Sequence, residues 1–309
     1  PMSFVECYEP EFVRNFMAQH PDSPLFVRKV WNNEIRLSLE LHETASCEAL
    51  LNDANAFALQ LTYRPAQANA QEITARDFIL NQALLNVVAL SALSAEHLLY
   101  GAGILLSRAD KIPGHDGVTL ASLTTLPQTL ADLAQNGSLQ AQFAMLPSLP
   151  QLPEQMLKLS GGFDFDWSLL PDCPRKASLP LQVSLLMSQD ANSAALFDQQ
   201  LKKQWQQTYE QYFLHTPWIL SNYLIYRIYH DLIPLAGVES YFQLVSDFFF
   251  LRTLLALWTL DGSALRRKDI FALFALFERW RGSENAVEIR QHIQSLRRAD
   301  PLLSAFSLL

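Results

Sequence analysis

Apolar residues recur every three to four positions along most of this sequence, which is the period of an amphipathic helix. Over 9–20, for example, Phe12 and Phe16 fall on one face, with Val13 and Met17 beside them. Seven further segments follow the same period and are predicted to be helices: 47–63, 72–93, 96–110, 119–135, 194–215, 267–281 and 284–298.

One segment near the start of the chain departs from this period. Over 35–41 (IRLSLEL) apolar residues alternate with charged or hydroxylated ones, which is typical of a strand with one buried face. The pattern therefore predicts a mainly α fold, a multi-helical bundle-like architecture with a short β or extended arm near residues 25–41.

The longest apolar stretch, 212–260, indicates two helices, 218–232 and 240–260. The second is long enough to raise the question of a membrane span. Asp247 and Arg252 interrupt it, however, and charges near the centre of a bilayer cost several kcal/mol. A buried helical hairpin is therefore expected, without membrane association.

Polar side chains occupy both helices of this hairpin at positions that a purely apolar core would not use: Asn222, Arg227, His230, Asp231, Asp247 and Arg252. At 100° per residue, Asp247 and Arg252 lie about 140° apart, so they do not pair within their own helix. Each therefore needs a partner elsewhere, and the preceding helix offers Arg227 and Asp231, which are spaced i,i+4. Two interpretations remain open: a buried polar network that fixes the packing, or a site that contacts a ligand.

Prolines and glycines concentrate between residues 145 and 180, which makes this the loosest connection in the chain. We therefore predict an N-terminal helical half at 1–145, a Pro/Gly-rich connection at 146–180 and a C-terminal helical half at 181–309. With 309 residues, half of them apolar, the chain can bury a large core.

The chain is acidic, with a formal net charge of −8 and a pI near 5.4. Nonspecific nucleic-acid binding requires a basic surface, so it is not expected. Basic residues do collect in the C-terminal quarter. A run of this kind is either a solvated helix face or a surface for an acidic partner.

Three widely spaced cysteines, Cys7, Cys47 and Cys173, show no CxxC pattern or other metal-ligand spacing. A metal site built from this chain alone is therefore not predicted. The odd count fits a reducing compartment, and no secretory signal precedes Phe4, so a cytoplasmic location is expected. The adjacent pair His115-Asp116 lies in a Gly/Pro-rich turn and is interpreted as loop composition, not as a catalytic pair.

Two parts of the sequence resemble the flagellin lysine-N-methylase (FliB-type) family. Residues 221–234 (SNYLIYRIYHDLIP), followed by 249–255 (FFLRTLL), are similar to the family's ENYLVNYIFRNLFPF-like motif and its Arg-bearing helix. Residues 36–39 (RLSL) and 46–49 (SCEA) are similar to its ERSLTLSCPEA segment. The resemblance runs in register from about residue 9 to 280.

This resemblance implies a bacterial lysine N-methyltransferase that moves a methyl group from S-adenosylmethionine to lysine side chains of flagellin. Methyl transfer to an amine needs a neutral lysine, so a carboxylate and tyrosines suit the site. The residues expected to act there are Tyr223 and Asp231 in catalysis, supported by Tyr226 and Tyr229, and Asn222, Arg227 and Arg252 in cofactor binding. Flagellin would be the protein partner.

The family's N-terminal cysteine-rich segment holds an iron–sulfur cluster, and here this sequence departs from the pattern. Between Phe16 and Phe26, where the segment should lie, there is no cysteine. A single thiolate does not hold a cluster, so no iron–sulfur cluster is expected from this chain. The alternative to a methyltransferase is then a non-enzymatic, all-helical binding or regulatory relative. Binding of S-adenosylmethionine discriminates between the two.

Overall fold

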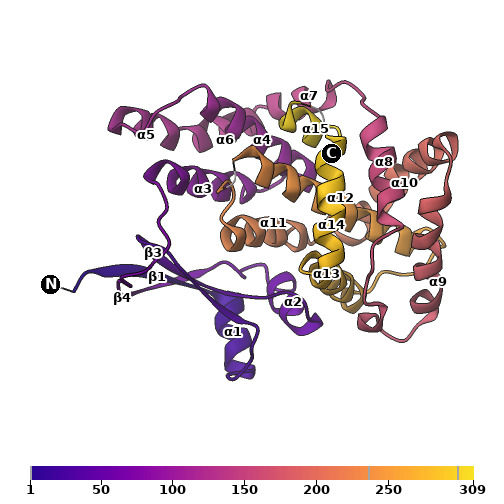
Figure 1. Ribbon diagram of the computed structural model, residues 1–309, viewed down its shortest axis with the longest axis horizontal. Helices are drawn as coiled ribbons and strands as arrows, with labels where there is room; N and C mark the ends of the chain where they lie inside the picture. Colours follow the sequence, from indigo (N-terminus) through magenta and orange to yellow (C-terminus); the bar gives the residue numbers. More distant parts are fainter. Residues whose placement is uncertain (1, 236, 298) are drawn as a thin grey trace. The chain divides into compact units, whose positions relative to one another are not determined.

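The protein is described by a computed structural model covering residues 2–235, 237–297 and 299–309. Helices make up 63% of it and strands 9%, which confirms the mainly α prediction. The chain forms two compact units, each built from several stretches. Figure 1 labels their helices and strands. Unit 1 comprises Pro1–Glu40, Ala49–Leu146 and Trp218–Phe242, and unit 2 comprises Leu41–Glu48, Pro147–Pro217 and Gln243–Leu309. The division at 145 and 181 stays a prediction.

Unit 1 combines a small sheet with helices. Its elements are β1 (Phe4–Pro10), α1 (Glu11–Gln19), β2 (Phe26–Val30), β3 (Glu34–Leu39), β4 (Leu59–Pro65), α3 (Ala75–Val88), α4 (Ala95–Asp110), α5 (Gly117–Thr124), α6 (Leu126–Gln135), α7 (Ser138–Ala144) and α11 (Trp218–Asp231). Two helices, α2 (Thr44–Leu51) and α12 (Val238–Thr259), continue from one unit into the other.

The sheet has the strand order β2-β3-β1-β4. Strands β2 and β3 form an antiparallel hairpin, which confirms the arm predicted near residues 25–41. Strand β1 runs parallel to β3, and β4 runs antiparallel to β1. The helix predicted over 47–63 is wrong beyond Leu51, because residues 59–65 (LQLTYRP) alternate with period two and pair with β1.

Helix α11 lies along one face of this sheet, and its polar side chains bond to the neighbouring backbone. The Tyr226 hydroxyl donates to the Leu39 carbonyl at 2.7 Å, and the Tyr229 hydroxyl donates to the Leu37 carbonyl at 2.9 Å. On the α3 side, Asn81 Nδ2 donates to the carbonyls of Ile228 and Ile233. Such bonds satisfy buried polar groups and fix the position of α11 between β3 and α3.

Among the described residues of unit 2, every regular element is a helix. Its elements are α8 (Gln151–Ser160), η1 (Trp167–Leu169), α9 (Pro174–Ser184), η2 (Leu185–Ser188), α10 (Ala191–Tyr212), α13 (Arg267–Arg281), α14 (Glu284–Leu296) and α15 (Pro301–Phe306), together with most of α12. The Phe163 ring stacks on Trp280 at 3.9 Å and meets Phe250 edge-on at 4.6 Å. This aromatic group joins the Pro/Gly-rich connection to α12 and α13.

Several acidic loop residues prove to be helix caps. Asp116, from the pair His115-Asp116, accepts a hydrogen bond from the Thr119 backbone N–H at 2.7 Å and begins α5. Asp190 does the same for α10 through the Ser193 backbone N–H at 2.8 Å. These bonds stabilise the ionised carboxylates and lower the pKa of both aspartates. Capping explains the two residues without a catalytic role.

Helix α12 is 22 residues long and apolar enough to cross a membrane by length and composition. Within the protein, however, 94% of its most apolar 18-residue window is buried. That burial is the pattern of a helix at the centre of a folded core, so its apolar character is explained by packing.

Candidate functional site

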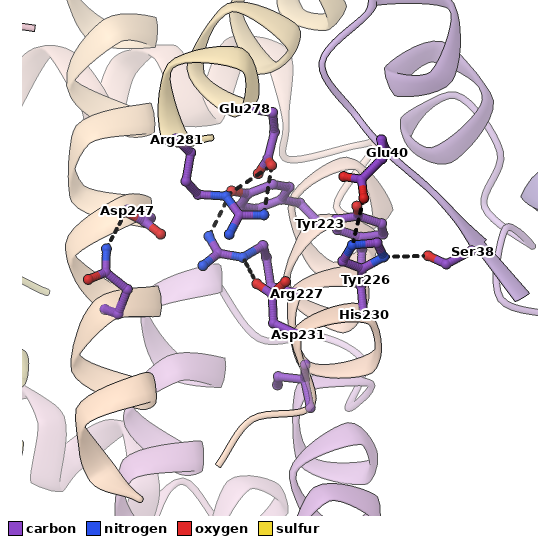
Figure 2. Close-up of polar contacts among 12 residues, drawn as sticks. Ser38, Glu40, Tyr223, Tyr226, Arg227, His230, Asp231, Asp247, Glu278 and Arg281 are labelled. Carbon is purple, nitrogen blue, oxygen red and sulfur yellow. Dashed lines mark hydrogen bonds and ion pairs between the residues drawn. The ribbon is translucent and has the colours of Figure 1, made fainter. Parts of the chain in front are cut away.

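Three of the predicted site residues form one row on α11. Figure 2 shows Arg227 between the other two, with its Nε donating to Asp231 Oδ2 at 2.6 Å and its Nη1 donating to the Tyr223 hydroxyl at 3.0 Å. The residues are spaced i, i+4 and i+8, so they line a single stripe of the helix. We call them the α11 row.

The α11 row changes from buried to accessible along its length. Tyr223 is 1% exposed and Arg227 2%, whereas the Asp231 side chain keeps 26% of its surface in contact with solvent. The Arg227 guanidinium also lies 5.8 Å from the centre of the Tyr223 ring, within the range of a cation–π interaction. The row therefore presents one carboxylate at its open end, oriented by a buried cation.

Asn222 is adjacent to the row in sequence but faces another direction. Its Nδ2 donates to the carbonyl of Leu50 at 3.0 Å and to that of Asp53 at 2.8 Å. Both amide hydrogens are therefore used to hold the last turn of α2 and the residues just after it. This side chain satisfies two carbonyls of the fold, and its predicted cofactor contact stays a prediction.

Arg252, the remaining predicted site residue, belongs to unit 2. Its Nη1 and Nη2 donate to the carbonyls of Leu309 and Leu308 at 2.9 and 2.6 Å. Its guanidinium also lies over the rings of Phe248 and Phe249, at 5.9 and 5.5 Å. These contacts tie the last residues to α12, and the cofactor role predicted for Arg252 remains untested.

A second polar group lies on the other side of α11, at the end of β3. The Ser38 hydroxyl and His230 Nδ1 are 2.7 Å apart, and His230 Nε2 lies 3.7 Å from Glu40 Oε1 (Figure 2). The order of hydroxyl, imidazole and carboxylate resembles a hydrolase triad. Ser38 is fully buried, however, so no substrate reaches its hydroxyl. The group links β3 to α11 instead.

A buried ion pair lies beside this link, on the same face of β3. Arg36 Nε donates to Glu34, and its Nη1 donates to the Tyr229 carbonyl at 3.0 Å. The rings of Trp31 and Tyr229 flank the guanidinium at 5.4 and 5.0 Å. Burial raises the pKa of the Glu34 carboxyl, against the opposing effect of Arg36. It also raises the pKa of the Tyr229 hydroxyl, which stays a neutral hydrogen-bond donor.

The three cysteines are free thiols. Cys7 and Cys47 are buried, and Cys173 is partly buried. The Cys47 thiol donates to the Leu41 carbonyl, and burial, followed by the nearby Glu278 carboxylate, raises its pKa well above the usual value. Cluster ligands are thiolates, and Cys47 is held protonated. Across the ranges that the structure describes, no three His, Cys, Asp or Glu side chains gather as metal ligands.

Two small hollows occur among the described residues of unit 2. One, of about 20 Å³, is lined by charged and aromatic side chains that include Asp198, Lys202, Trp205 and Arg252. The other, of about 40 Å³, is lined mainly by leucine, glutamine and serine. Pockets for drug-sized ligands range from about 300 to 1,000 Å³. Both hollows are therefore too small for a whole S-adenosylmethionine molecule.

Comparison with known proteins identifies the class of protein to which this fold and the α11 row belong. A family model described as the FliB lysine N-methylase C-terminal domain matches residues 81–308, about three quarters of the chain. The chain therefore belongs to the FliB lysine N-methylase family, which confirms the resemblance found in the sequence motifs. No curated protein and no solved structure matches it.

Sequence reasoning named the α11 row but missed the residues that position α11. The sequence identified Ser38 and Glu40 only as polar positions of the alternating segment 35–41. It identified Asn81 only as a polar residue within the helix predicted over 72–93. The signal that could have found them is the excess of hydrogen-bonding groups on α11. Each buried hydroxyl or imidazole there requires a partner, and the partners lie more than a hundred residues away in sequence.

Proposed function

We propose that this protein transfers a methyl group from S-adenosylmethionine to lysine side chains of flagellin. The observation that carries the proposal is the family match over residues 81–308, which includes the whole of α11. The α11 row supports it, because a lysine side chain is a cation and Asp231 is an accessible carboxylate. A cytoplasmic location is part of the proposal, and the three free cysteines support it.

In this proposal Asp231 receives the lysine amine. A lysine ammonium ordinarily has a pKa of about 10.4, so it must lose a proton before it acts as a nucleophile. The proton leaves through the Asp231 carboxylate to the water that reaches it. The neutral Nζ then forms a bond to the methyl carbon of the donor while the carbon–sulfur bond breaks, and S-adenosylhomocysteine departs. Methylation should therefore become faster as pH rises toward the lysine pKa.

Arg227 and Tyr223 act through Asp231. The guanidinium donates to one carboxylate oxygen of Asp231 at 2.6 Å and so fixes the orientation of the carboxylate that receives the amine. The Tyr223 hydroxyl accepts a second hydrogen bond from the same guanidinium, so two hydrogen bonds fix its orientation. We regard both as positioning residues. Their loss should lower kcat more than it raises KM, because orientation matters most in the transition state.

The second candidate is a non-enzymatic binding or regulatory relative. A specific observation favours it: Asn222 and Arg252, which were predicted to bind the cofactor, both donate hydrogen bonds to backbone carbonyls. Such a protein would keep the family fold for recognition alone. It would bind flagellin without consuming a methyl donor.

Calorimetric titration with S-adenosylmethionine, followed by methylation of purified flagellin with an isotopically labelled donor, separates the candidates. A methyltransferase binds the donor at micromolar concentration and labels lysines. Asp231→Asn should abolish labelling, whereas Glu40→Gln, which removes an accessible carboxylate outside the row, should leave it unchanged. Absence of heat up to millimolar donor, together with absence of label, would establish the second candidate.

A further inference from the structure

Aromatic side chains surround one carboxylate on the face of the sheet that α11 also contacts. Glu6 lies opposite Tyr63 of β4 in the antiparallel register, and opposed residues share a face with Cβ atoms about 4.5–5.5 Å apart. Phe4 and Tyr8 occupy the positions two residues before and two residues after Glu6 on β1, so they lie on the same face. We call Phe4, Glu6, Tyr8 and Tyr63 the aromatic cluster.

The aromatic cluster is accessible to solvent. Phe4 is 61% exposed and Tyr63 is 64% exposed, whereas Glu6 and Tyr8 are partly buried. Leu61, opposite Tyr8 on β4, adds an apolar side chain that is 44% exposed. Large apolar side chains gathered on one face are characteristic of a binding surface, not of the scattered apolar exposure of most proteins. The cluster therefore presents a carboxylate between rings that a ligand can reach.

The charges around Glu6 are unbalanced. Glu34 of β3 lies opposite Glu6 in the parallel register, so the two carboxylates are neighbours. Arg36 pairs with Glu34, and within the described part of the chain Glu6 forms no ion pair. Lys29, the other basic residue of the strands on this face, lies two strands away on β2. A cation bound beside Glu6 would balance the remaining negative charge.

The hydrogen-bonding capacity of the cluster selects the kind of cation. The Tyr8 hydroxyl donates to one carboxylate oxygen of Glu6. Burial, followed by this bond, raises the pKa of Tyr8, so the hydroxyl remains a donor and the carboxylate its acceptor. A lysine ammonium carries three N–H donors and is strongly hydrated, and the rings around Glu6 do not replace the water that it would lose.

An N-methylated lysine fits this surroundings better than an unmodified one. Methylation keeps the positive charge and removes N–H donors, so less hydrogen bonding to water is lost on binding. The methyl groups pack against ring faces, which is how aromatic cages recognise methyl-lysine and other substituted ammonium ions. Side chains that start about 5–7 Å apart on neighbouring sheet positions can bring their rings within the ~6 Å that a cation–π interaction requires.

We propose that the aromatic cluster binds an N-methylated lysine side chain of a protein. Its charge lies beside Glu6, its methyl groups contact Phe4 and Tyr63, and apolar residues that flank it in sequence lie along Leu61. Such a ligand is the product of the reaction proposed above, so the inference rests on the proposed function for the source of its ligand. A product site of this kind would retain a flagellin molecule that already carries methyl-lysine while further lysines are modified.

Fluorescence anisotropy with labelled synthetic peptides tests the site without any catalysis. The peptides alternate leucine with serine and carry a central lysine with zero, one, two or three Nε-methyl groups, or norleucine as the uncharged control. Affinity for the wild-type protein should rise with each methyl group. The trimethyl peptide should bind roughly tenfold more tightly than the unmodified one, and the norleucine peptide should bind most weakly.

Variants of the cluster assign the binding to particular side chains. Tyr63→Ala should abolish the preference for methylated peptides, and Tyr63→Phe should retain it. Phe26→Ala removes an exposed aromatic ring from the other face of the sheet and should leave every affinity unchanged. Glu6→Gln should weaken the binding of all the charged peptides but not of the norleucine peptide.

Three results would each overturn the proposal: equal affinity for the unmodified and trimethyl peptides, tight binding of the norleucine peptide, or a methyl preference that survives Tyr63→Ala. The outcome is separable from that of the proposed function. A protein that prefers methylated peptides but does not label flagellin would refute the proposed function alone. One that labels flagellin but does not discriminate among the peptides would refute this inference alone.

Discussion

Replacing Asp231 by alanine tests whether the α11 row is a buried ionic network. The change removes the carboxylate that accepts from Arg227 Nε at 2.6 Å and leaves a guanidinium that is only 2% exposed. A hydrogen bond to a charged group contributes about 1.5–3 kcal/mol, and breaking a fully buried ion pair costs about 3–5 kcal/mol. Because Asp231 is 26% exposed and the Tyr223 hydroxyl still accepts a hydrogen bond, we expect a loss of roughly 2–3 kcal/mol.

The assay is urea unfolding of four proteins: wild type, Asp231→Ala, Arg227→Met and the double variant. In the Arg227→Met background the guanidinium is absent, so the free-energy cost of Asp231→Ala should fall to below about 0.5 kcal/mol. The coupling energy is then roughly 2 kcal/mol. A cost below about 0.5 kcal/mol in the wild-type background would refute the reasoning, because it would place Asp231 among ordinary surface residues.

Three further changes probe other parts of the fold. Asn222→Ala leaves one buried and one partly buried carbonyl without their donor and should lower the free energy of unfolding by about 1–3 kcal/mol in urea titrations; a neutral result would contradict the structural role. Gly161→Ala brings a Cβ to 2.6 Å from a backbone nitrogen and should cost about 1–3 kcal/mol, whereas Gly117→Ala meets nothing within 4 Å and should be neutral. Asp190 has a lowered pKa when folded, so its contribution is complete above the unfolded pKa of about 3.9 and is lost as pH falls through the folded pKa. Asp190→Asn should therefore show a smaller fall in Tm than wild type between neutral and acidic pH, and an equal fall would refute this.

The parts of the fold that sequence reasoning predicted are those that local periodicity determines. The helix predicted over 267–281 coincides with α13, and α11 and α12 begin and end within two residues of the predicted bounds. The sequence offered Arg227 and Asp231 as partners for Asp247 and Arg252, and the structure shows an ion pair between Arg227 and Asp231 themselves, which their i,i+4 spacing allows. A helix places such neighbours together whatever the rest of the chain does.

The parts of the fold that could not be predicted from the sequence depend on partners that are distant along the chain. Residues 59–65 form a strand because they pair with β1, which lies about fifty residues earlier in the sequence. The helical period of the residues just before them led to the prediction of one continuous helix over 47–63. The helix predicted over 119–135 is divided at Thr125, because Pro127 lacks the N–H that a continuous helix needs there. The bonds of Asn222 to carbonyls near residue 50 likewise have no local signal.

Mass spectrometry of flagellin lysines tests the central claim most directly. Flagellin would be coexpressed with this protein, with its Asp231→Asn variant, or alone, and each lysine-containing peptide weighed. The account predicts methylated lysines only with the wild-type protein, and unmodified lysines with a folded Asp231→Asn variant. Lysines of unchanged mass in the presence of the wild-type protein, or methylation that persists with the variant, would contradict it.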